Sequence, residues 1–423
     1  MPTPSKKACQ TRIFASTWLA YAGYYFCRKA LYVAKAKGGI GDALGLSSMD
    51  LAQIGTVFLV GYAIGQFASA WLGRRLGPKV LLLTGMGLSL LCNAAFGLSN
   101  GFWTVALFMA INGMAQGTGW PGCIGSLGHW FRRETRGSIL GLWSTCYQLG
   151  SIAATAFAAW LLSVWGWRWS FFGASLVLLA VWAFVLVVHP GTPEKMGLQP
   201  VRDDPEPVSS DKPAQAESKG LGWSRDVAVS IAMMGAIYFC IKFLRYALWS
   251  WTPFLLSQNF GIEKGKAGYL STIFDACGFV GVILSGVLSD RVWKGRRSLV
   301  SLLMTAGMTL SFVAMYVWGA GSVTGFAVCL GFCGFMLYGP DALLSGVGAI
   351  DVGTARGALV AAGIINGMGS IGPIFEEQMI GWMYGAFQHR LLPILTMFVV
   401  VSVAGMVAMG WLHLRARAGR ARI

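Results

Sequence analysis

The sequence predicts an all-α membrane protein with twelve transmembrane helices in two pseudo-symmetric six-helix halves, with both chain ends in the cytoplasm. Hydrophobic residues make up 55% of the 423 residues and charged residues only 12%. A soluble chain of this length could not bury so much apolar surface. Apolar runs long enough to cross a bilayer recur along the chain, and two arginines stand at matching places inside such runs. These observations together indicate a duplicated membrane unit.

Twelve apolar runs account for the predicted helices. They begin near Ile13, Leu51, Val80, Phe102, Gly137 and Trp169 and, after a polar break, near Val227, Ala267, Leu299, Val323, Ala358 and Leu391. An even number of spans places both ends of the chain on one side of the bilayer. Lys and Arg gather at these ends and in alternate loops, which marks that side as cytoplasmic. The first run lacks a small-residue cleavage site, so we expect it to be retained as a helix.

The polar break, residues 189–226, is rich in proline, serine and charges of both signs, and it has no apolar periodicity. We expect a solvated cytoplasmic linker there, joining an N-terminal half (1–188) to a C-terminal half (227–423). The net charge of +16 lies in short loops, as topology signals do, so it does not indicate a nucleic-acid partner. The nine cysteines show no metal or disulfide spacing, and we expect no cofactor.

Two pairs of arginines support the duplication. Arg28 and Arg245 are 217 positions apart, and Arg75 in GRRLGPK and Arg291 in SDRVWKGRR are 216 positions apart. A repeated six-helix unit explains both intervals and would set Arg28 and Arg245 facing each other across a central cavity. An arginine at mid-bilayer costs about 2.5–3.5 kcal/mol of insertion free energy. This cost indicates a functional role for both Arg28 and Arg245. Two guanidinium forks suit a doubly charged oxyanion such as phosphate.

Several strings, in order along nearly the whole chain, carry a family resemblance: YYFCRKALYVAKA, GMAQGTGWPGCIGSLGHWFRRETRGS, WGWRWSFF, PEKMGLQP, KFLRYALWSWTP, FDACGFVGVILSGVLSDR and YGP. They resemble the organophosphate:phosphate antiporter family of the major facilitator superfamily, which includes glycerol-3-phosphate and hexose-phosphate transporters and a hexose-phosphate sensor.

The resemblance implies a transporter, not an enzyme, in the lipid bilayer of the bacterial cytoplasmic (inner) membrane. It would work as a monomer and exchange a small glycerol-, glycerate- or sugar-phosphate for inorganic phosphate by rocker-switch alternating access. Two alternatives stay open. One is a transporter-like sugar-phosphate sensor, and the other is a proton-coupled organic-anion symporter.

The resemblance assigns phosphate binding to Arg28 and Arg245. Three tyrosines, Tyr21, Tyr24 and Tyr25, lie within two turns of Arg28 and share or flank its helix face, where they could contact an organic group. The alternative is that Arg28 is locked against a carboxylate as a packing device. Tyr338 of the YGP string is expected to line the same site.

This chain departs from the family at three site positions. Relatives carry a lysine where Gln66 stands and a histidine where Tyr147 stands. Lys242 lies three residues before Arg245, on the same helix face, where relatives tend to have tyrosine. Lys242 would therefore replace the missing cation, or it would extend to the membrane surface.

Charge-balancing and gating roles are also implied. Lys29 would pair with Asp275, although Asp275 could make an ordinary helix contact instead. Asp290 and Arg291, with Arg75 in the first copy of the motif, would form a conformational latch. Two further acidic residues, Glu376 and Glu377, could titrate in a proton-coupled cycle or be solvated helix-end carboxylates.

Overall fold

The computed structural model describes residues 5–131, 139–140, 142–199, 224–293, 296–344 and 349–419. These residues form helices and their connections, with no β-strand among them. The predicted all-α class is confirmed. The basic loop residues Arg132, Arg133, Arg136 and Lys294, and the side chains of Arg74 and Asp290, lie outside what is described.

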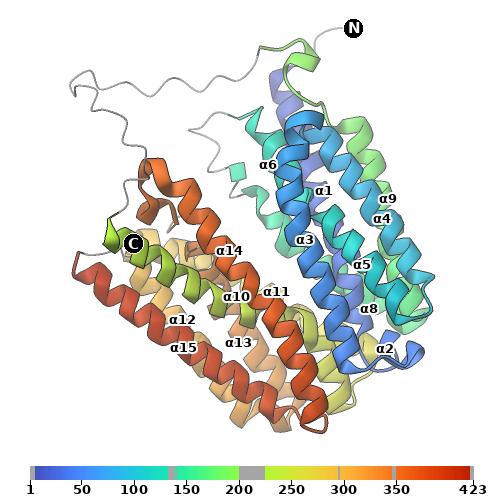
Figure 1. Cartoon of the computed structure of the whole chain (residues 1–423), viewed down its shortest axis with the longest axis vertical. Helices are drawn as coiled ribbons and strands as arrows, with labels where there is room; N and C mark the ends of the chain where they lie inside the picture. Colours follow the sequence, from blue (N-terminus) through green and yellow to red (C-terminus); the bar gives the residue numbers. More distant parts are fainter. Residues whose placement is uncertain are drawn as a thin grey trace. The chain divides into compact units, whose positions relative to one another are not determined.

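The chain begins with α1 (Lys6–Ala34), α2 (Ile40–Leu44), α3 (Ser48–Leu76), α4 (Pro78–Gly97), α5 (Phe102–Gln116), α6 (Gly119–Gly128), α8 (Thr145–Val164), α9 (Trp167–Val188) and η1 (Glu194–Met196). It continues with α10 (Arg225–Phe260), α11 (Lys264–Val287), η2 (Leu288–Val292), α12 (Arg297–Val317), η3 (Gly319–Gly321), α13 (Val323–Ala342), α14 (Ala349–Ala386) and α15 (Leu392–Arg417). Figure 1 shows these helices.

The helices match the predicted apolar runs. Nine described helices are long and apolar enough to cross a membrane. The three other runs correspond to α1, which carries charged residues, to the α5–α6 pair and to α14. The start predicted near Gly137 falls outside the described residues. The fourth run is broken between Gln116 and Gly119, where a glycine-rich turn and Pro121 disfavour a continuous helix.

Two compact units make up the chain, one comprising Met1–Ala34 with Val57–Glu217 and the other Lys35–Thr56 with Ser218–Ile423. Helix pairing repeats between them. In the first unit α1 packs on α8 and α9, and α4 packs on α9; in the second α10 packs on α14 and α15, and α12 packs on α15. This repetition agrees with two pseudo-symmetric halves.

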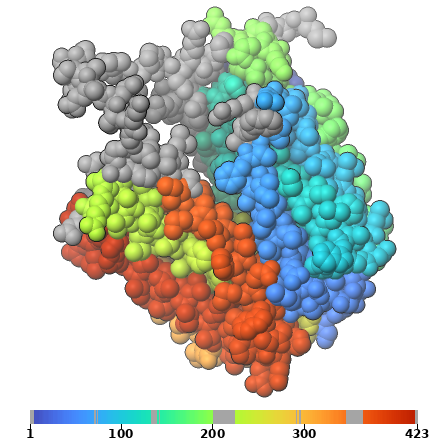
Figure 2. All heavy atoms as spheres, viewed as in Figure 1, coloured from blue at the N-terminus to red at the C-terminus, as the bar shows by residue number. Residues whose placement is uncertain are grey.

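Glycines bring paired helices close together in both units. In Figures 1 and 2, α3 (blue) and α5 (cyan) run side by side. A Cβ on Gly61 would overlap the carbonyl oxygen of Ala110, and one on Gly113 would overlap that of Phe58. In the second unit a Cβ on Gly334 would overlap the carbonyl oxygen of Phe274. Small residues at such crossings let helix backbones approach each other in membranes.

The start of the predicted linker is packed, not solvated. His189 is 2% exposed, and its Nε2 lies 3.0 Å from the Ser126 hydroxyl. Lys79 Nζ donates to the carbonyl oxygen of His189 at 2.6 Å, and Trp130 Nε1 donates to that of Gly191 at 2.8 Å. The expectation of a wholly solvated linker is therefore wrong for its first residues. Residues 200–223 lie outside the described part.

Candidate functional site

Arg28 lies in the middle of a polar and aromatic cluster in the first unit. Its side chain is 7% exposed, and its Nε donates to Gln116 Oε1 at 2.9 Å. Its guanidinium carbon lies 4.9 Å from the ring centroid of Tyr25 and 5.0 Å from that of Tyr62. Such contacts stabilise a cation without neutralising it. We call these four residues the Arg28 cluster.

Behind this cluster, a hydrogen-bonded chain orients the amide of Gln116. Gln116 Nε2 donates to Asn112 Oδ1 at 3.3 Å and to Ser89 Oγ at 3.4 Å. Ser89 Oγ donates to Asn112 Oδ1 at 2.7 Å. All three residues are fully buried. Because its amide nitrogen is engaged on one side, Gln116 presents its oxygen to Arg28, and this oxygen is the acceptor that the guanidinium needs.

The predicted tyrosines occupy different environments. Tyr21 packs edge-on against Tyr25, with ring centroids 6.0 Å apart, and also contacts Trp120 and Trp143 at 5.7 and 5.3 Å. It therefore extends the aromatic surface beside Arg28. Tyr24 is fully buried, and its hydroxyl lies 3.0 Å from that of Thr118. In this structure Tyr24 is a helix-packing residue.

Gln66 and Tyr147, the two departures in the first unit, are less buried. Gln66 is exposed on α3, one turn after Tyr62, and Tyr147 is half-buried near the start of α8. The contacts described above do not place either beside the guanidinium. Their predicted role in substrate binding stays a prediction.

Arg245 forms a second cluster, in the second unit. Its Nη1 donates to Asp341 Oδ2 at 2.8 Å, and the two side chains are 18% and 11% exposed. Its guanidinium carbon lies 4.6 Å from the ring centroid of Tyr338. The Tyr338 hydroxyl donates to Asp275 Oδ1. Helices α10, α11 and α13 each contribute to these four residues, which we call the Arg245 cluster.

Lys242 extends the Arg245 cluster toward α14. Its Nζ donates to Asn366 Oδ1 at 3.3 Å and to Ser370 Oγ at 3.2 Å, and it lies 4.8 Å from the ring centroid of Tyr238. The side chain is half-buried, whereas Asn366 and Ser370 are exposed. These contacts hold Lys242 between α10 and α14, so the alternative of extension to the membrane surface does not describe this structure.

The predicted charge-balancing residues are buried. Lys29 is 3% exposed and Asp275 is 2% exposed, and Asp275 accepts the Tyr338 hydrogen bond. Pairing of Lys29 with Asp275 stays a prediction. Among the latch residues, Arg75 and Arg291 are exposed at the ends of α3 and η2. The side chain of Asp290 lies outside the described part, so its role in the latch also stays a prediction.

Sequence reasoning missed three residues of these clusters: Tyr62, Gln116 and Asp341. Each carried a signal. Tyr62 lies one turn before Gln66 in the same apolar run, Gln116 is an amide within an apolar run and directly before a glycine, and Asp341 is an acid directly after the YGP string. Asp341 supplies Arg245 with a carboxylate partner, which the sequence analysis did not assign to it.

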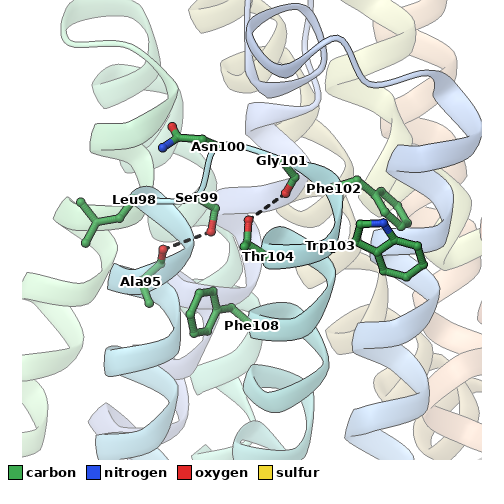
Figure 3. A pocket seen from close by; sticks show the side chains of 9 residues that line it. All are labelled: Ala95, Leu98, Ser99, Asn100, Gly101, Phe102, Trp103, Thr104 and Phe108. Carbon is green, nitrogen blue, oxygen red and sulfur yellow. Dashed lines mark hydrogen bonds between the residues drawn. The ribbon is translucent and has the colours of Figure 1, made fainter.

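A hollow of about 450 Å³ lies at the turn between α4 and α5 (Figure 3), and none of its lining residues belongs to either cluster. Its nine lining residues include no charged side chain. Two of its hydroxyls are engaged locally: Ser99 donates to the Ala95 carbonyl oxygen and Thr104 to that of Gly101. Trp103 at its rim is 81% exposed. The hollow offers apolar surface and nothing that would hold an anion.

The Major Facilitator Superfamily model matches residues 17–375. The chain belongs to this superfamily. It is 26% identical to the probable hexose phosphate transport protein of Chlamydia pneumoniae, with 91% of this chain and 89% of the relative covered. It is 30% identical to putative glycerol-3-phosphate transporter 3 of Arabidopsis thaliana, with 90% of this chain and 82% of the relative covered. These relatives match the organophosphate:phosphate antiporter family suspected from the sequence strings.

The fold of this superfamily member also matches solved structures. A bacterial homologue of the human lysosomal transporter Spinster aligns with a TM-score of 0.70 at 15% identity, with 97% of this chain and 98% of that chain covered. At this identity the likeness establishes the fold alone. Membership of the superfamily and the similarity to transporters together identify this chain as a multi-pass membrane protein. Its role is transport, and it is not an enzyme.

Proposed function

We propose that this protein exchanges a small organic phosphate ester for inorganic phosphate across the membrane. The observation that carries the proposal is an arginine at the same place in each repeated half, buried at Arg28 and partly buried at Arg245, and held among aromatic rings and hydrogen-bonding groups. The relatives named for hexose phosphate and glycerol-3-phosphate transport support phosphate esters as the substrate class. A bacterial cytoplasmic membrane and a monomeric working unit belong to the same proposal.

Arg28 and Arg245 would bind the same phosphoryl group. A guanidinium carries five N–H donors in a rigid fork and binds phosphate through paired donors. The Gln116 contact at Nε holds the guanidinium of Arg28 by one edge, which restricts how the fork can rotate. Asp341 does the same for Arg245 through Nη1. Restricting the forks before the anion arrives lowers the entropy lost on binding.

The surroundings of each arginine suit the rest of a phosphate ester. Tyr21 and Tyr25 offer flat rings and hydroxyl groups beside Arg28, and such rings pack against the carbon face of a sugar or glycerol group. Lys242, Asn366 and Ser370 offer donors and acceptors near Arg245. We propose that this polar group binds the hydroxyls of the ester or a second anionic group.

Charge explains why exchange would exceed net leak. In the site that we propose, the guanidinium groups and Lys242 would repel one another without an anion, and this repulsion would oppose closure of the site. Asp341 offsets part of the charge near Arg245. A dianion offsets the rest, so the loaded carrier would change conformation faster than the empty one. Binding of either phosphate or its ester would satisfy the same requirement.

Counterflow in proteoliposomes tests the proposal. Vesicles loaded with labelled inorganic phosphate are diluted into glycerol-3-phosphate, 3-phosphoglycerate, hexose 6-phosphates or unphosphorylated analogues, with and without a pH gradient. We expect efflux of label that requires an external phosphate monoester and is lost in Arg28→Lys. Efflux that ignores phosphate esters but follows the pH gradient would establish a proton-coupled symporter instead. Binding of an ester without any efflux would establish a sensor.

A further inference from the structure

A buried ion pair lies in the second unit, outside the Arg245 cluster. Lys35 Nζ lies 2.9 Å from Glu377 Oε2 and 3.2 Å from Oε1, and the two side chains are 0% and 1% exposed. Trp251 contacts both partners. Its Nε1 donates to Glu377 Oε2 at 2.9 Å, and its ring centroid lies 4.2 Å from Lys35 Nζ. Lysine and glutamate thus balance each other in a dry site.

Glu376, next to this pair, is a second carboxyl group without a matching cation. It is 0% exposed, and neither side-chain oxygen has a hydrogen-bond partner among the described residues. The charged groups that act on it are Glu377 on its own helix and Lys35, while Trp251 on the neighbouring α10 is uncharged. The interpretation of Glu376 and Glu377 as solvated helix-end carboxylates is therefore wrong.

Charge balance determines the protonation state of Glu376. Lys35 already pairs with Glu377 through both carboxylate oxygens. If Glu376 were also ionised, the cluster would hold an uncompensated negative charge away from water. A buried charge without a partner is strongly disfavoured, and the group becomes neutral instead. Burial and charge balance therefore both favour the neutral form of Glu376.

Lys35 belongs to the segment Lys35–Thr56, which follows α1, contains α2 and the first residues of α3, and groups with the second unit. Several bonds besides the ion pair seat this segment on α10 and α14. Gln378 Nε2 donates to Thr56 Oγ1 at 2.7 Å, Ser48 Oγ to the Gly381 carbonyl oxygen at 3.0 Å, and the Lys37 amide to Ser257 Oγ at 2.9 Å. We call Lys35–Thr56 the seated segment.

The seat is tightly fitted at Glu377. A Cβ on Gly55 would lie 2.7 Å from Glu377 Cδ and Oε1, so a larger residue there would push the Glu377 carboxylate out of its place. A cavity of about 270 Å³ adjoins the ion pair, and it is lined by Lys35, Ser48, Gln258 and nine other residues. Lys35 stands at the end of α1 opposite the basic N-terminal residues, so this cavity belongs to the outer end of the helix.

We propose that Glu376 is a proton-binding site that must be occupied for the seated segment to rest on α10 and α14. When the segment lifts, water reaches the cluster, and the Glu376 carboxyl group gives up its proton to become a carboxylate. When the segment returns, the carboxylate takes one proton from water at the outer end. The proposed transport cycle would require the segment to lift. The inference rests on the proposed function for this step alone.

Uptake and release on the same side distinguish this site from proton coupling. A proton that enters and leaves from the outer solution crosses no membrane, so it drives no transport. It makes seating depend on external pH instead. Because one proton is released on lifting, the ratio of seated to lifted molecules should fall on the order of tenfold per pH unit in the neutral range. Acid outside would favour the seated state.

Hydrogen–deuterium exchange of peptides covering residues 35–56 measures the ratio of seated to lifted molecules. The experiment uses the full-length protein in lipid nanodiscs with no substrate present. After correction for the intrinsic pH dependence of amide exchange, protection in the wild type should fall on the order of tenfold per pH unit between about pH 5 and pH 8. Glu376→Gln mimics the protonated group and should keep protection constant over this range. Glu263→Gln, at an exposed acid on the same unit, should behave as the wild type does.

Two results would overturn the inference: wild-type protection that does not change with pH, or a Glu376→Gln variant that keeps the wild-type slope. Gly55→Ala provides a reference for a weakened seat, because its methyl group displaces the Glu377 carboxylate without changing a charge, and its protection should be lower than that of the wild type throughout this pH range. The wild-type titration alone decides the matter if a variant fails to fold. Since no phosphate takes part, failure of phosphate exchange in proteoliposomes would leave this measurement valid.

Discussion

Asp341→Asn should tighten phosphate binding, because the carboxylate competes with the anion for Arg245. The two side chains meet at 2.8 Å and are less than a third exposed, so solvent screens their interaction only in part. A hydrogen bond to a charged group contributes about 1.5–3 kcal/mol, and a neutral one about 0.5–1.5 kcal/mol. An asparagine oxygen still accepts the neutral kind. The substitution therefore removes about 1–1.5 kcal/mol of competition, which corresponds to about five- to tenfold tighter binding.

Calorimetric titration of the purified protein with inorganic phosphate measures this change. The matched control is Asp226→Asn, which also removes the carboxylate from an Arg–Asp pair, but at Arg415, with the Asp226 side chain 55% exposed. The control should leave phosphate affinity unchanged. Tighter binding also slows release, so exchange in vesicles should slow in Asp341→Asn alone. Unchanged or weaker phosphate binding in Asp341→Asn would refute competition between Asp341 and the substrate.

Three further outcomes follow from the structure. Arg28→Lys should raise the half-saturation concentration for phosphate by at least about tenfold, because an ammonium group loses the paired hydrogen bonds of the fork; an unchanged value in the exchange assay contradicts this role. Lys242→Gln should raise the half-saturation concentration for phosphate esters by about three- to tenfold, the loss of one partly screened charge, and unchanged uptake would remove Lys242 from the site. Burial lowers the pKa of His189 to about 4 from its usual 6.5, so neutral His189 stabilises the fold fully above about pH 6.5, and this contribution is lost as pH falls toward 4. The free energy of unfolding should drop by about 2 kcal/mol between pH 7.5 and pH 5, and a His189→Asn variant with the same pH dependence would exclude this histidine as the cause.

Features that depend on a local sequence pattern could be predicted. Helix positions followed from apolar length, and Arg28 and Arg245 stood out because a permanent charge is rare in an apolar run. Two aromatic residues near Arg28 followed from helical spacing, since Tyr25 lies about one turn and Tyr21 about two turns before it. In each of these cases the partner lies on the same helix or at a fixed repeat.

Contacts between distant segments could not be predicted in this way. Glu377 and Lys35 are 342 positions apart, and each by itself has the composition expected of a wet helix end. Gln116 approaches Arg28 only because α5 breaks where it does. Asp341 gave a signal, an acid inside an apolar run, but nothing in the sequence says which cation it meets. The packing of helices that are distant in the sequence determines these pairs, and local sequence patterns do not predict that packing.

The central claim is that Arg28 and Arg245 bind one phosphate together. Equilibrium binding of labelled inorganic phosphate to the purified protein tests it most directly, measured as the number of sites per chain in the wild type, Arg28→Lys and Arg245→Lys. The account predicts one phosphate per chain, with affinity reduced at least about tenfold by either substitution. Two phosphates per chain, or full affinity in either variant, would contradict it.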